Sequence, residues 1–366
     1  EWISDKTRFA YDGLKKRRLD IPFVKQLGKL ATASWRDAFA AIKARLDGVP
    51  GNRIGFILGD QVDCETMVLV KDLAASLGTA NVDCRQDGTK LTAAERGSYL
   101  FNTTIAGIEA ADACLLIGTN PRHEAPLVNA RLRKRHRLGG FKVGRIGAPF
   151  DLTYPVTDLG AGGQTLQDLL DGKHSFAEVL KKAERPMLIL GQGPLTRPDG
   201  AAILAAARQL AERFAMVEGD WNGCNVLHTA ASRVGGLELG LVPGDGGLDV
   251  AAMLEPKALD VVFLIGADEV ATTGLGDTFT VYMGTHGDRG VHAADVILPG
   301  AAYTEKHGTW VNTEGRPQRA KLAVFPPGEA KEDWKILRAL SEALGRKVPL
   351  DTLGEVRRRM AEMAPT

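Results

Sequence analysis

Four short apolar runs, each ending in glycine, constrain the fold of this 366-residue chain more than any other feature. The runs are 54–59 (IGFILG), 114–118 (CLLIG), 187–191 (MLILG) and 261–266 (VVFLIG). They are too short for helices and apolar throughout, which is typical of strands buried on both faces of a parallel sheet. Glycine at the carboxyl end of a strand lets the chain turn sharply or approach a ligand closely.

Helical segments alternate with these runs. Apolar residues at helical spacing predict helices over 35–46, 62–77, 201–214, 331–344 and 353–363. Ser34 and Asp37 form a loose capping box for the first helix, and Gly78 is a candidate C-cap for the second. Glycine and proline predict loops at 160–163, 235–247 and 326–328. The alternation predicts a doubly wound α/β architecture.

The charge balance excludes some classes of partner. Lys and Arg total 46 against 45 Asp and Glu, so the net charge of +1 gives no reason to expect nucleic acid or an anionic membrane surface. We interpret the basic run 131–137 as a solvated helix face. No stretch approaches the roughly 18 uninterrupted apolar residues of a membrane span. The chain opens without Met or a signal-peptide pattern, which predicts a processed product or a portion of something longer.

The residues that commonly hold metals are scattered. Three histidines, His286, His292 and His307, fall close together but lack a pattern such as H-E-x-x-H, so a loop or structural role is expected for each. No two cysteines form a C-x-x-C pair, and buried free thiols are the prediction for all four. The cysteines are Cys64, Cys84, Cys114 and Cys224.

Open parallel sheets place ligands beyond the carboxyl ends of their strands. The loops 118–121, 191–194 and 266–268 are therefore the natural ligand-facing segments. None of them is a G-x-G-x-x-G fingerprint, because Gly191-x-Gly193 continues with Pro194 and lacks the third glycine. There is no P-loop and no G-x-S-x-G nucleophile elbow. A nucleotide site or a hydrolase site is weakly supported.

The most distinctive segment lies in the last third of the chain. Residues 294–299 read ADVILP, and residues 305–318 read EKHGTWVNTEGRPQ. Here the sequence resembles the molybdopterin oxidoreductase superfamily, whose members carry an A-D-V-x-L-P strand followed by E-x-x-G-T-x-x-N-x-E-G-R-x-Q. DKTRFAYD at 5–12 and LIGTNP at 116–121 match the same superfamily. The three matches occur in the right order and cover nearly the whole chain.

Within that superfamily the chain is most similar to the large iron–sulfur subunits of respiratory complex I, NADH:quinone oxidoreductase. The similarity is carried by EWISDKTRFAYDGL at 1–14, NTTIAG at 102–107, NPRHEAPL at 120–127 and DWKI at 333–336. The resemblance implies that the cysteines binding the 2Fe-2S and 4Fe-4S clusters lie upstream and are absent from this chain.

One departure from the catalytic relatives concerns the metal ligand. Those relatives hold molybdenum or tungsten through two pterin dithiolenes, often with a Cys, selenocysteine or Ser shortly after a segment resembling Asn81-Val82-Asp83. Here Cys84 comes a few residues too early, and the stretch 85–90 holds no thiol. The resemblance therefore implies no catalytic, cofactor-binding or metal-binding residues in this chain.

The same resemblance implies the domain layout. Two doubly wound, Rossmann-like domains are expected, as in formate dehydrogenase and DMSO reductase, without the separate C-terminal β-barrel. Residues 1–85 and 181–330 would form one discontinuous domain, residues 86–180 the inserted domain, and residues 331–366 two terminal helices.

The functional expectation is a non-catalytic scaffold within a proton-translocating enzyme of electron transport. It would pack against other peripheral-arm subunits, including the NADH- and flavin-binding subunit, without nucleic acid or direct membrane insertion. Its expected place is the cytoplasmic face of a bacterial inner membrane or the matrix side of the mitochondrial one. An active molybdopterin-dependent oxidoreductase of formate-dehydrogenase type, with Cys84 or another group at the metal, is the first alternative. An unrelated nucleotide-binding α/β protein is the second.

Overall fold

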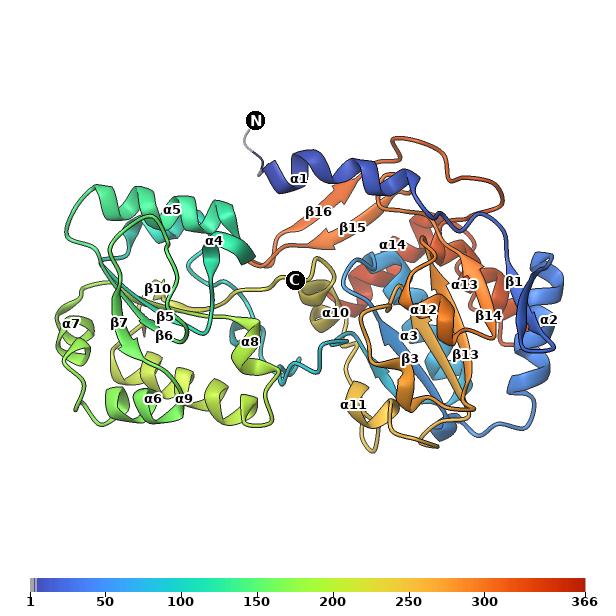
Figure 1. Cartoon of the computed structure of the whole chain (residues 1–366), viewed down its shortest axis with the longest axis horizontal. Helices are drawn as coiled ribbons and strands as arrows, with labels where there is room; N and C mark the ends of the chain where they lie inside the picture. Colours follow the sequence, from blue (N-terminus) through green and yellow to red (C-terminus); the bar gives the residue numbers. More distant parts are fainter. Residues whose placement is uncertain (1–2, 4, 366) are drawn as a thin grey trace. The chain divides into compact units, whose positions relative to one another are not determined.

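The computed structural model describes Ile3 and residues 5–365 and divides into two compact units (Figure 1). Three residues of the opening motif, Glu1, Trp2 and Ser4, lie outside the described residues. Unit 1 comprises Glu1–Arg8, Thr89–Thr229 and Thr313–Arg316. Unit 2 comprises Phe9–Gly88, Ala230–Asn312 and Pro317–Thr366.

Unit 2 is built on a seven-stranded sheet with the order β2-β1-β14-β13-β12-β3-β4. The five strands from β14 to β4 run parallel, and the β1–β2 hairpin adds an antiparallel edge. The strands are β1 Phe23–Gln26, β2 Lys29–Thr32, β3 Ile54–Leu58, β4 Val82–Asp83, β12 Val261–Ile265, β13 Phe279–Gly284 and β14 Val296–Pro299. Phe56 and Phe263 stack in register on neighbouring strands, with ring centroids 4.6 Å apart.

Helices and a separate hairpin complete unit 2. The helices are α2 Trp35–Leu46, α3 Cys64–Leu77, α10 Arg233–Glu238, α11 Val250–Met253, α12 Arg289–Ala293, α13 Asp333–Ala343 and α14 Leu353–Met363, with the 3-10 helix η1 at Ala10–Lys15. β15 Gly308–Val311 and β16 Pro317–Ala320 pair antiparallel. Both carboxy-terminal helices pack on α3. One face of the sheet buries Ile57, Leu264 and Ile297 against Val250 and Met253 of α11.

Unit 1 is built on a five-stranded parallel sheet with the order β11-β8-β5-β6-β7. Its strands are β5 Ala113–Ile117, β6 Lys142–Ile146, β7 Thr157–Gly160, β8 Pro186–Leu190 and β11 Cys224–Val226, and a small hairpin joins β9 Val217–Glu218 to β10 Trp221–Asn222. Its helices are α4 Pro121–Glu124, α5 Pro126–Arg137, α6 Gly163–Leu170, α7 Phe176–Lys182, α8 Gln192–Leu195 and α9 Gly200–Arg213. α1 (Asp5–Phe9) spans the boundary between the two units.

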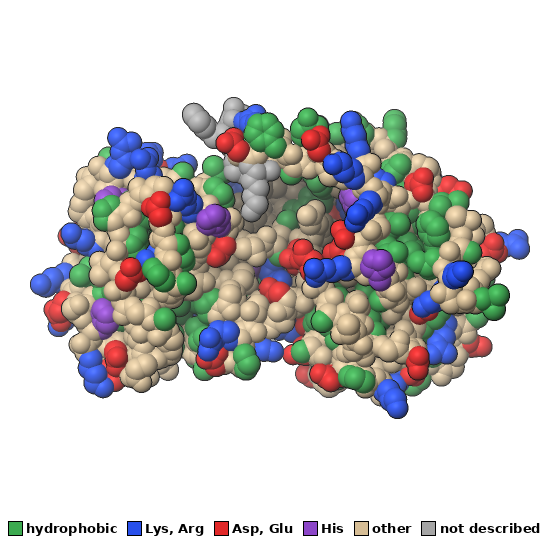
Figure 2. All heavy atoms as spheres, in the orientation of Figure 1, with side chains coloured by type: hydrophobic (Ala, Val, Ile, Leu, Met, Phe, Trp, Pro, Cys, Tyr) green, Lys and Arg blue, Asp and Glu red, His purple; other side chains and the backbone are tan. Residues whose placement is uncertain are grey.

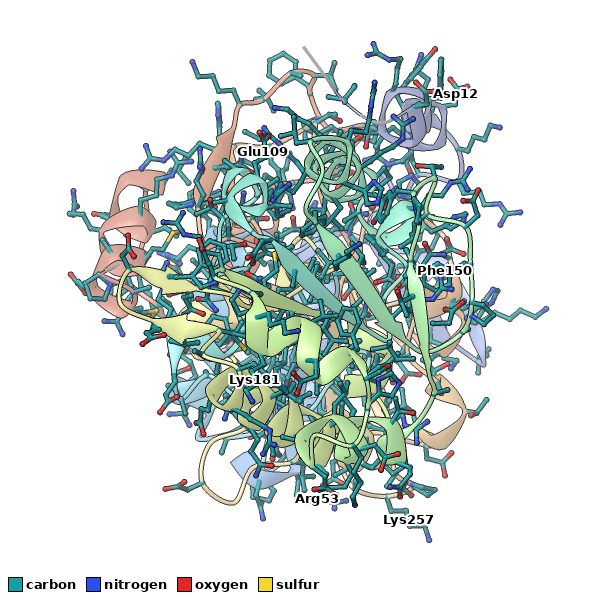
Figure 3. All side chains as sticks on the ribbon, turned by 90° about the vertical axis from the view of Figure 1, so that its left-hand side faces the viewer. Asp12, Arg53, Glu109, Phe150, Lys181 and Lys257 are labelled. Carbon is teal, nitrogen blue, oxygen red and sulfur yellow. The ribbon has the colours of Figure 1, made fainter. Side chains whose placement is uncertain are left out.

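The core of unit 1, like that of unit 2, forms where apolar strand residues pack against a helix. Leu116 of β5 and Val143 of β6 pack against Val128 and Leu132 of α5, and all four are buried. Phe150 (Figure 3) follows β6, and the guanidinium of Arg145 lies 4.6 Å from the centre of its ring.

The doubly wound α/β prediction is confirmed, since each apolar run forms a buried parallel strand and each predicted helix is present within two residues of its expected ends. Ser34 caps α2 by accepting a hydrogen bond from the Asp37 amide, and Gly78 ends α3 with a left-handed φ of 71°. The basic run lies on α5, where Arg131 and Lys134 both contact Glu109 (Figure 3). No helix among the described residues is long and apolar enough to cross a membrane.

Two expectations differ from the structure. The predicted domain boundary at 180/181 falls inside unit 1, because β8 pairs in parallel with β5 and draws the following residues, up to Thr229, into that unit. The predicted loop 235–247 begins inside α10. Both Gly235 and Gly236 lie in this helix, where a β-carbon would come within 2.6 Å of the sulfur of Cys64 or Cys84, respectively. These glycines permit close packing of α10.

Candidate functional site

The carboxyl edge of the unit 2 sheet is where the fold would place a ligand. β3 and β12 end there in Gly59 and Gly266, and the Gly59 amide donates to the carbonyl of Ile265 at 2.9 Å. A β-carbon on Gly59 would collide with the carbonyl oxygen of Gly266. Gly266, in one of the segments expected to face a ligand, and Gly59 therefore allow two strand ends to pack backbone to backbone.

The amino-terminal end of α10 covers this edge with a buried arginine. Arg233 is 1% exposed, and its Nη2 lies 3.0 Å from the Asp87 carboxylate and 3.7 Å from that of Asp60. Its Nε donates to the carbonyl of Cys84 at 3.2 Å. The neighbouring Ser232 hydroxyl donates to the carbonyl of Gly59 at 2.9 Å. The guanidinium is thus committed to groups of the protein itself.

The rest of the edge is acidic. Burial raises the pKa of Asp60, although the charge of Arg233 opposes the shift. Burial also raises the pKa values of Asp268 and Glu269, and for Glu269 repulsion by Asp60 and Asp268 adds to the effect. Gln86 donates to Glu269 at 3.3 Å. Negative charges on neighbouring carboxyl groups repel one another here, and they would also repel an anionic ligand.

The catalytic members of the superfamily hold a molybdopterin cofactor, which carries anionic phosphate and dithiolene groups, and the residues at this edge do not fit such a group. The buried cation at this edge, Arg233, is already paired with Asp87, and the charge of Arg289 acts on Asp268 and Glu269. Cys84 is fully buried beneath Gly236, and burial raises the pKa of its thiol to about 12. The backbone of α10 closes off the sulfur at Gly236, so the Cys84 side chain has no open face toward a metal.

The other cysteines and the histidines do not provide an alternative metal site. Burial raises the pKa of the thiols of Cys64 and Cys114, and it raises that of Cys224 to about 11. His286 contacts the Gly13 carbonyl at 3.0 Å, and the His307 ring lies 3.4 Å from the Leu322 amide. Within the described residues no three His, Cys, Asp or Glu side chains gather to hold a metal.

The carboxyl edge of the unit 1 sheet is closed in a similar way. Gly118 has a φ of 53°, and a β-carbon there would overlap the ring of Pro194. Glu124 accepts hydrogen bonds from the Thr119 hydroxyl at 2.8 Å and the Asn120 amide at 2.7 Å. The incomplete Gly191-x-Gly193 motif is thus part of a packed junction between loops, and a carboxylate occupies the place where a phosphate would need amide donors.

The motif at 305–318 contributes a buried ionic cluster that sequence reasoning missed. Lys306 is 6% exposed; its ammonium contacts the carboxylate of Asp333 and lies 2.7 Å from that of Asp63. Asp63 caps α3, and Asp333 is the first residue of α13. Burial by itself lowers the pKa of Lys306, but attraction by the two carboxylates outweighs it and raises that pKa.

Neighbouring motif residues also bind the structure together. Glu65 of α3 is fully buried and accepts hydrogen bonds from the Thr309 amide at 2.7 Å, the Thr309 hydroxyl at 2.8 Å and Arg357 of α14 at 2.8 Å. Glu305 pairs with Arg18 through both guanidinium Nη atoms. The residues that carry the family resemblance therefore join α3, the β15 strand and the terminal helices. The sequence offered no local signal for these pairings, because the partners are far apart in the chain.

The family model for molybdopterin oxidoreductase matches residues 18–343. The G subunit of NADH-quinone oxidoreductase from Rickettsia felis is 44% identical over 362 residues, which cover 99% of this chain and 53% of that protein. The corresponding protein of Rickettsia bellii is 43% identical over 365 residues, covering 100% of this chain and 52% of the relative. The chain spans about half the length of these curated relatives.

Two solved structures share the fold at low sequence identity. A chain of the formyltransferase/hydrolase complex of Methylorubrum extorquens, solved with methylofuran, superposes with a TM-score of 0.60 at 16% identity and covers 94% of this chain and 100% of its own. Acetylene hydratase from Pelobacter acetylenicus gives a TM-score of 0.59 at 12% identity, covering 96% of this chain and 65% of its own.

Proposed function

Because the chain belongs to the molybdopterin oxidoreductase family, we propose that it is the non-catalytic scaffold region of the large iron–sulfur subunit of proton-translocating NADH:quinone oxidoreductase. The observation that carries this proposal is the mismatch at the carboxyl edge of unit 2. Four acidic residues and the paired Arg233 occupy the edge where the family's anionic cofactor would need cations. A fold kept without its cofactor chemistry supports a structural role.

The two Rickettsia relatives support the assignment to this complex. On this proposal the iron–sulfur clusters that carry electrons toward quinone are bound by a part of the subunit upstream of this chain. The region itself packs against other peripheral-arm subunits, including the one that binds NADH and flavin. It lies on the cytoplasmic or matrix face of the membrane complex, and its two compact units correspond to the two doubly wound domains of the family core.

Elemental analysis and affinity purification test the two halves of the proposal. The purified chain is expected to hold no stoichiometric molybdenum or tungsten and no fluorescent pterin. A tagged chain produced in cells with the other subunits is expected to co-purify with NADH:quinone oxidoreductase activity.

A pair of cysteine variants sharpens the test. Cys84→Ser and the control Cys224→Ser should leave the metal content of the purified chain unchanged. Stoichiometric molybdenum or tungsten with pterin, lost in Cys84→Ser and kept in Cys224→Ser, would instead establish an active molybdopterin enzyme.

A further inference from the structure

The first segment of unit 2 exposes aromatic side chains that contribute little to its core. Phe9 at the end of α1 is 67% exposed, and Tyr11 on η1 is 57% exposed. On the segments around β15 and β16, Phe325 is 83% exposed, Val324 is 55% exposed and Tyr303 is 45% exposed. Apolar groups gathered on the surface of a folded protein mark interaction sites.

The segments that carry these exposed side chains are linked through the buried ion pair between Arg18 and Glu305. Arg18 donates to the Leu14 carbonyl at the end of η1 at 3.0 Å, and its guanidinium is paired with Glu305. The Thr304 carbonyl, next to Glu305, accepts a hydrogen bond from the Val324 amide at 3.2 Å. η1, the 303–305 segment and the 321–325 segment therefore meet around Arg18. The exposed aromatic side chains are therefore carried by segments that are held together, and aromatic side chains are enriched in the buried cores of protein interfaces.

Five cations lie on or next to the segments that carry the aromatic groups. Within the part of the chain that the structure describes, no ion pair involves any of these five cations. The backbone of Arg17 has a positive φ of 52°. The five cations are Lys15, Lys16, Arg17, Arg319 and Lys321. Figure 2 shows hydrophobic and basic side chains close together over η1 and β16, and Asp12 (Figure 3) is the one acidic residue of η1. We call the five cations and the five apolar side chains the aromatic–basic surface.

We propose that the aromatic–basic surface binds an acidic, apolar segment of another subunit of NADH:quinone oxidoreductase, an inference that rests on the proposed function. Cations around exposed aromatic groups attract an acidic partner, and buried aromatic anchors carry much of the affinity of protein interfaces. A second copy of this chain would bring the same cations together, and juxtaposed like charges suppress such pairing.

An anionic bilayer would also attract the cations, but the observations favour a protein partner. Interfacial membrane binding commonly uses an amphipathic helix that lies in the headgroup region. Here the aromatic groups come from the end of the five-residue helix α1, from the six-residue 3-10 helix η1 and from loops next to the Arg18–Glu305 pair. A rigid surface assembled from separate segments suits a partner of fixed shape.

The test compares two variants of the complete chain, each co-produced with the other subunits of the complex. Tyr11→Ser combined with Phe325→Ser is expected to weaken association by about tenfold or more, since each removes an aromatic anchor. The matched control is Leu138→Ser, which removes a side chain of unit 1 that is 70% exposed. It should associate like the parent chain, and all variants should keep the parent's unfolding midpoint.

A charge-reversal variant separates charge from apolar contact. Lys15→Glu combined with Lys321→Glu should slow association and flatten its dependence on salt concentration, because charge steering is lost. The control is Arg133→Glu at an exposed position of α5, which should change neither the association rate nor its salt dependence.

Three results would overturn the inference while the parent chain still assembles into the complex. The first is unchanged association of both surface variants. The second is self-association of the parent in sedimentation experiments that the serine variant abolishes. The third is equally strong, variant-sensitive binding to phosphatidylglycerol vesicles. Failure of the parent itself to join the complex would overturn the proposed function, and this inference with it.

Discussion

At the scale of single residues, the charged side chains of unit 2 fall into two groups with opposite consequences for stability. Lys306 is enclosed by Asp63 and Asp333, so a buried cation is balanced within hydrogen-bonding distance. Asp268 at the carboxyl edge has its pKa raised by burial, and Asp288 adds to that shift. The Lys306 cluster stabilises the fold only while the cation and its carboxylates are all present. The charge of Asp268 at the carboxyl edge instead lowers the stability of the folded state.

Lys306→Met is expected to reduce the free energy of unfolding by about 3–5 kcal/mol, because it leaves two buried carboxylates without their cation. Urea unfolding at pH 7 measures the loss. Lys335→Met, which removes a half-exposed partner of Glu332, is the control and should cost no more than about 1 kcal/mol. Equal losses in the two variants would refute the role assigned to the buried cluster.

The same cluster has a pH signature in the parent protein. Because the folded-state pKa of Lys306 is raised, its contribution is fully present below the ordinary lysine value of about 10.4. That contribution is lost as the pH rises through the folded-state value.

Asp268→Asn is expected to stabilise the protein at pH 7 by no more than about 1 kcal/mol, since the site is partly exposed and solvent screens it. The folded-state pKa of Asp268 is raised, so the folded protein keeps a proton that the unfolded chain has lost. Stability therefore falls as the pH rises from about 3.9 through the raised value. Unfolding curves from pH 3 to pH 7 should show the advantage of the variant growing with pH. The exposed control Asp277→Asn should show no such trend.

At the scale of elements, the helix ends of unit 2 carry the residues that local sequence rules favour, but one hairpin turn does not. α3 is capped by Asp63, which accepts from the Thr66 amide at 2.9 Å, and α14 begins with a capping box formed by Thr352 and Glu355. By contrast, the turn of the β1–β2 hairpin places Leu27 at a φ of 49° with its side chain fully exposed. Leucine is a poor residue for that conformation.

Leu27→Asn should therefore raise the free energy of unfolding by about 0.5–1 kcal/mol, because asparagine adopts the left-handed conformation more readily. Chemical denaturation of the isolated chain gives the number. Leu138→Asn tests whether removing an exposed leucine is enough by itself, since Leu138 follows α5 in a right-handed conformation. Stabilisation by both variants to the same degree would contradict the argument from backbone strain.

At the scale of the whole molecule, the chain holds two sheets with separate hydrophobic cores. In unit 1 Leu116 and Ile189 pack with Leu132, and in unit 2 Ile57 and Leu264 pack with Met253. Each compact unit has its own sheet and its own core, which is the usual definition of a domain.

Leu116→Ala is expected to cost about 2–5 kcal/mol through lost burial and the cavity left in the unit 1 core. Hydrogen exchange should lose protection mainly in β5, β6 and β8. Leu264→Ala is the reciprocal control and should expose β3, β12 and β13 instead. Loss of protection spread evenly over both sheets in either variant would contradict the assignment of separate cores.

Local sequence is enough to predict part of the secondary structure, namely the buried parallel strands β3, β5, β8 and β12 and the helices α2, α3, α9, α13 and α14. The four apolar runs and the helical periodicities specify them, because these elements depend on neighbours a few residues apart. The lack of close-spaced metal and phosphate motifs is also a property of local sequence. Strand pairing, the assignment of β8 to unit 1 and the burial of Lys306 between Asp63 and Asp333 emerge only in the folded chain. The physical reason is that pairing and burial depend on long-range contacts, which no local pattern encodes.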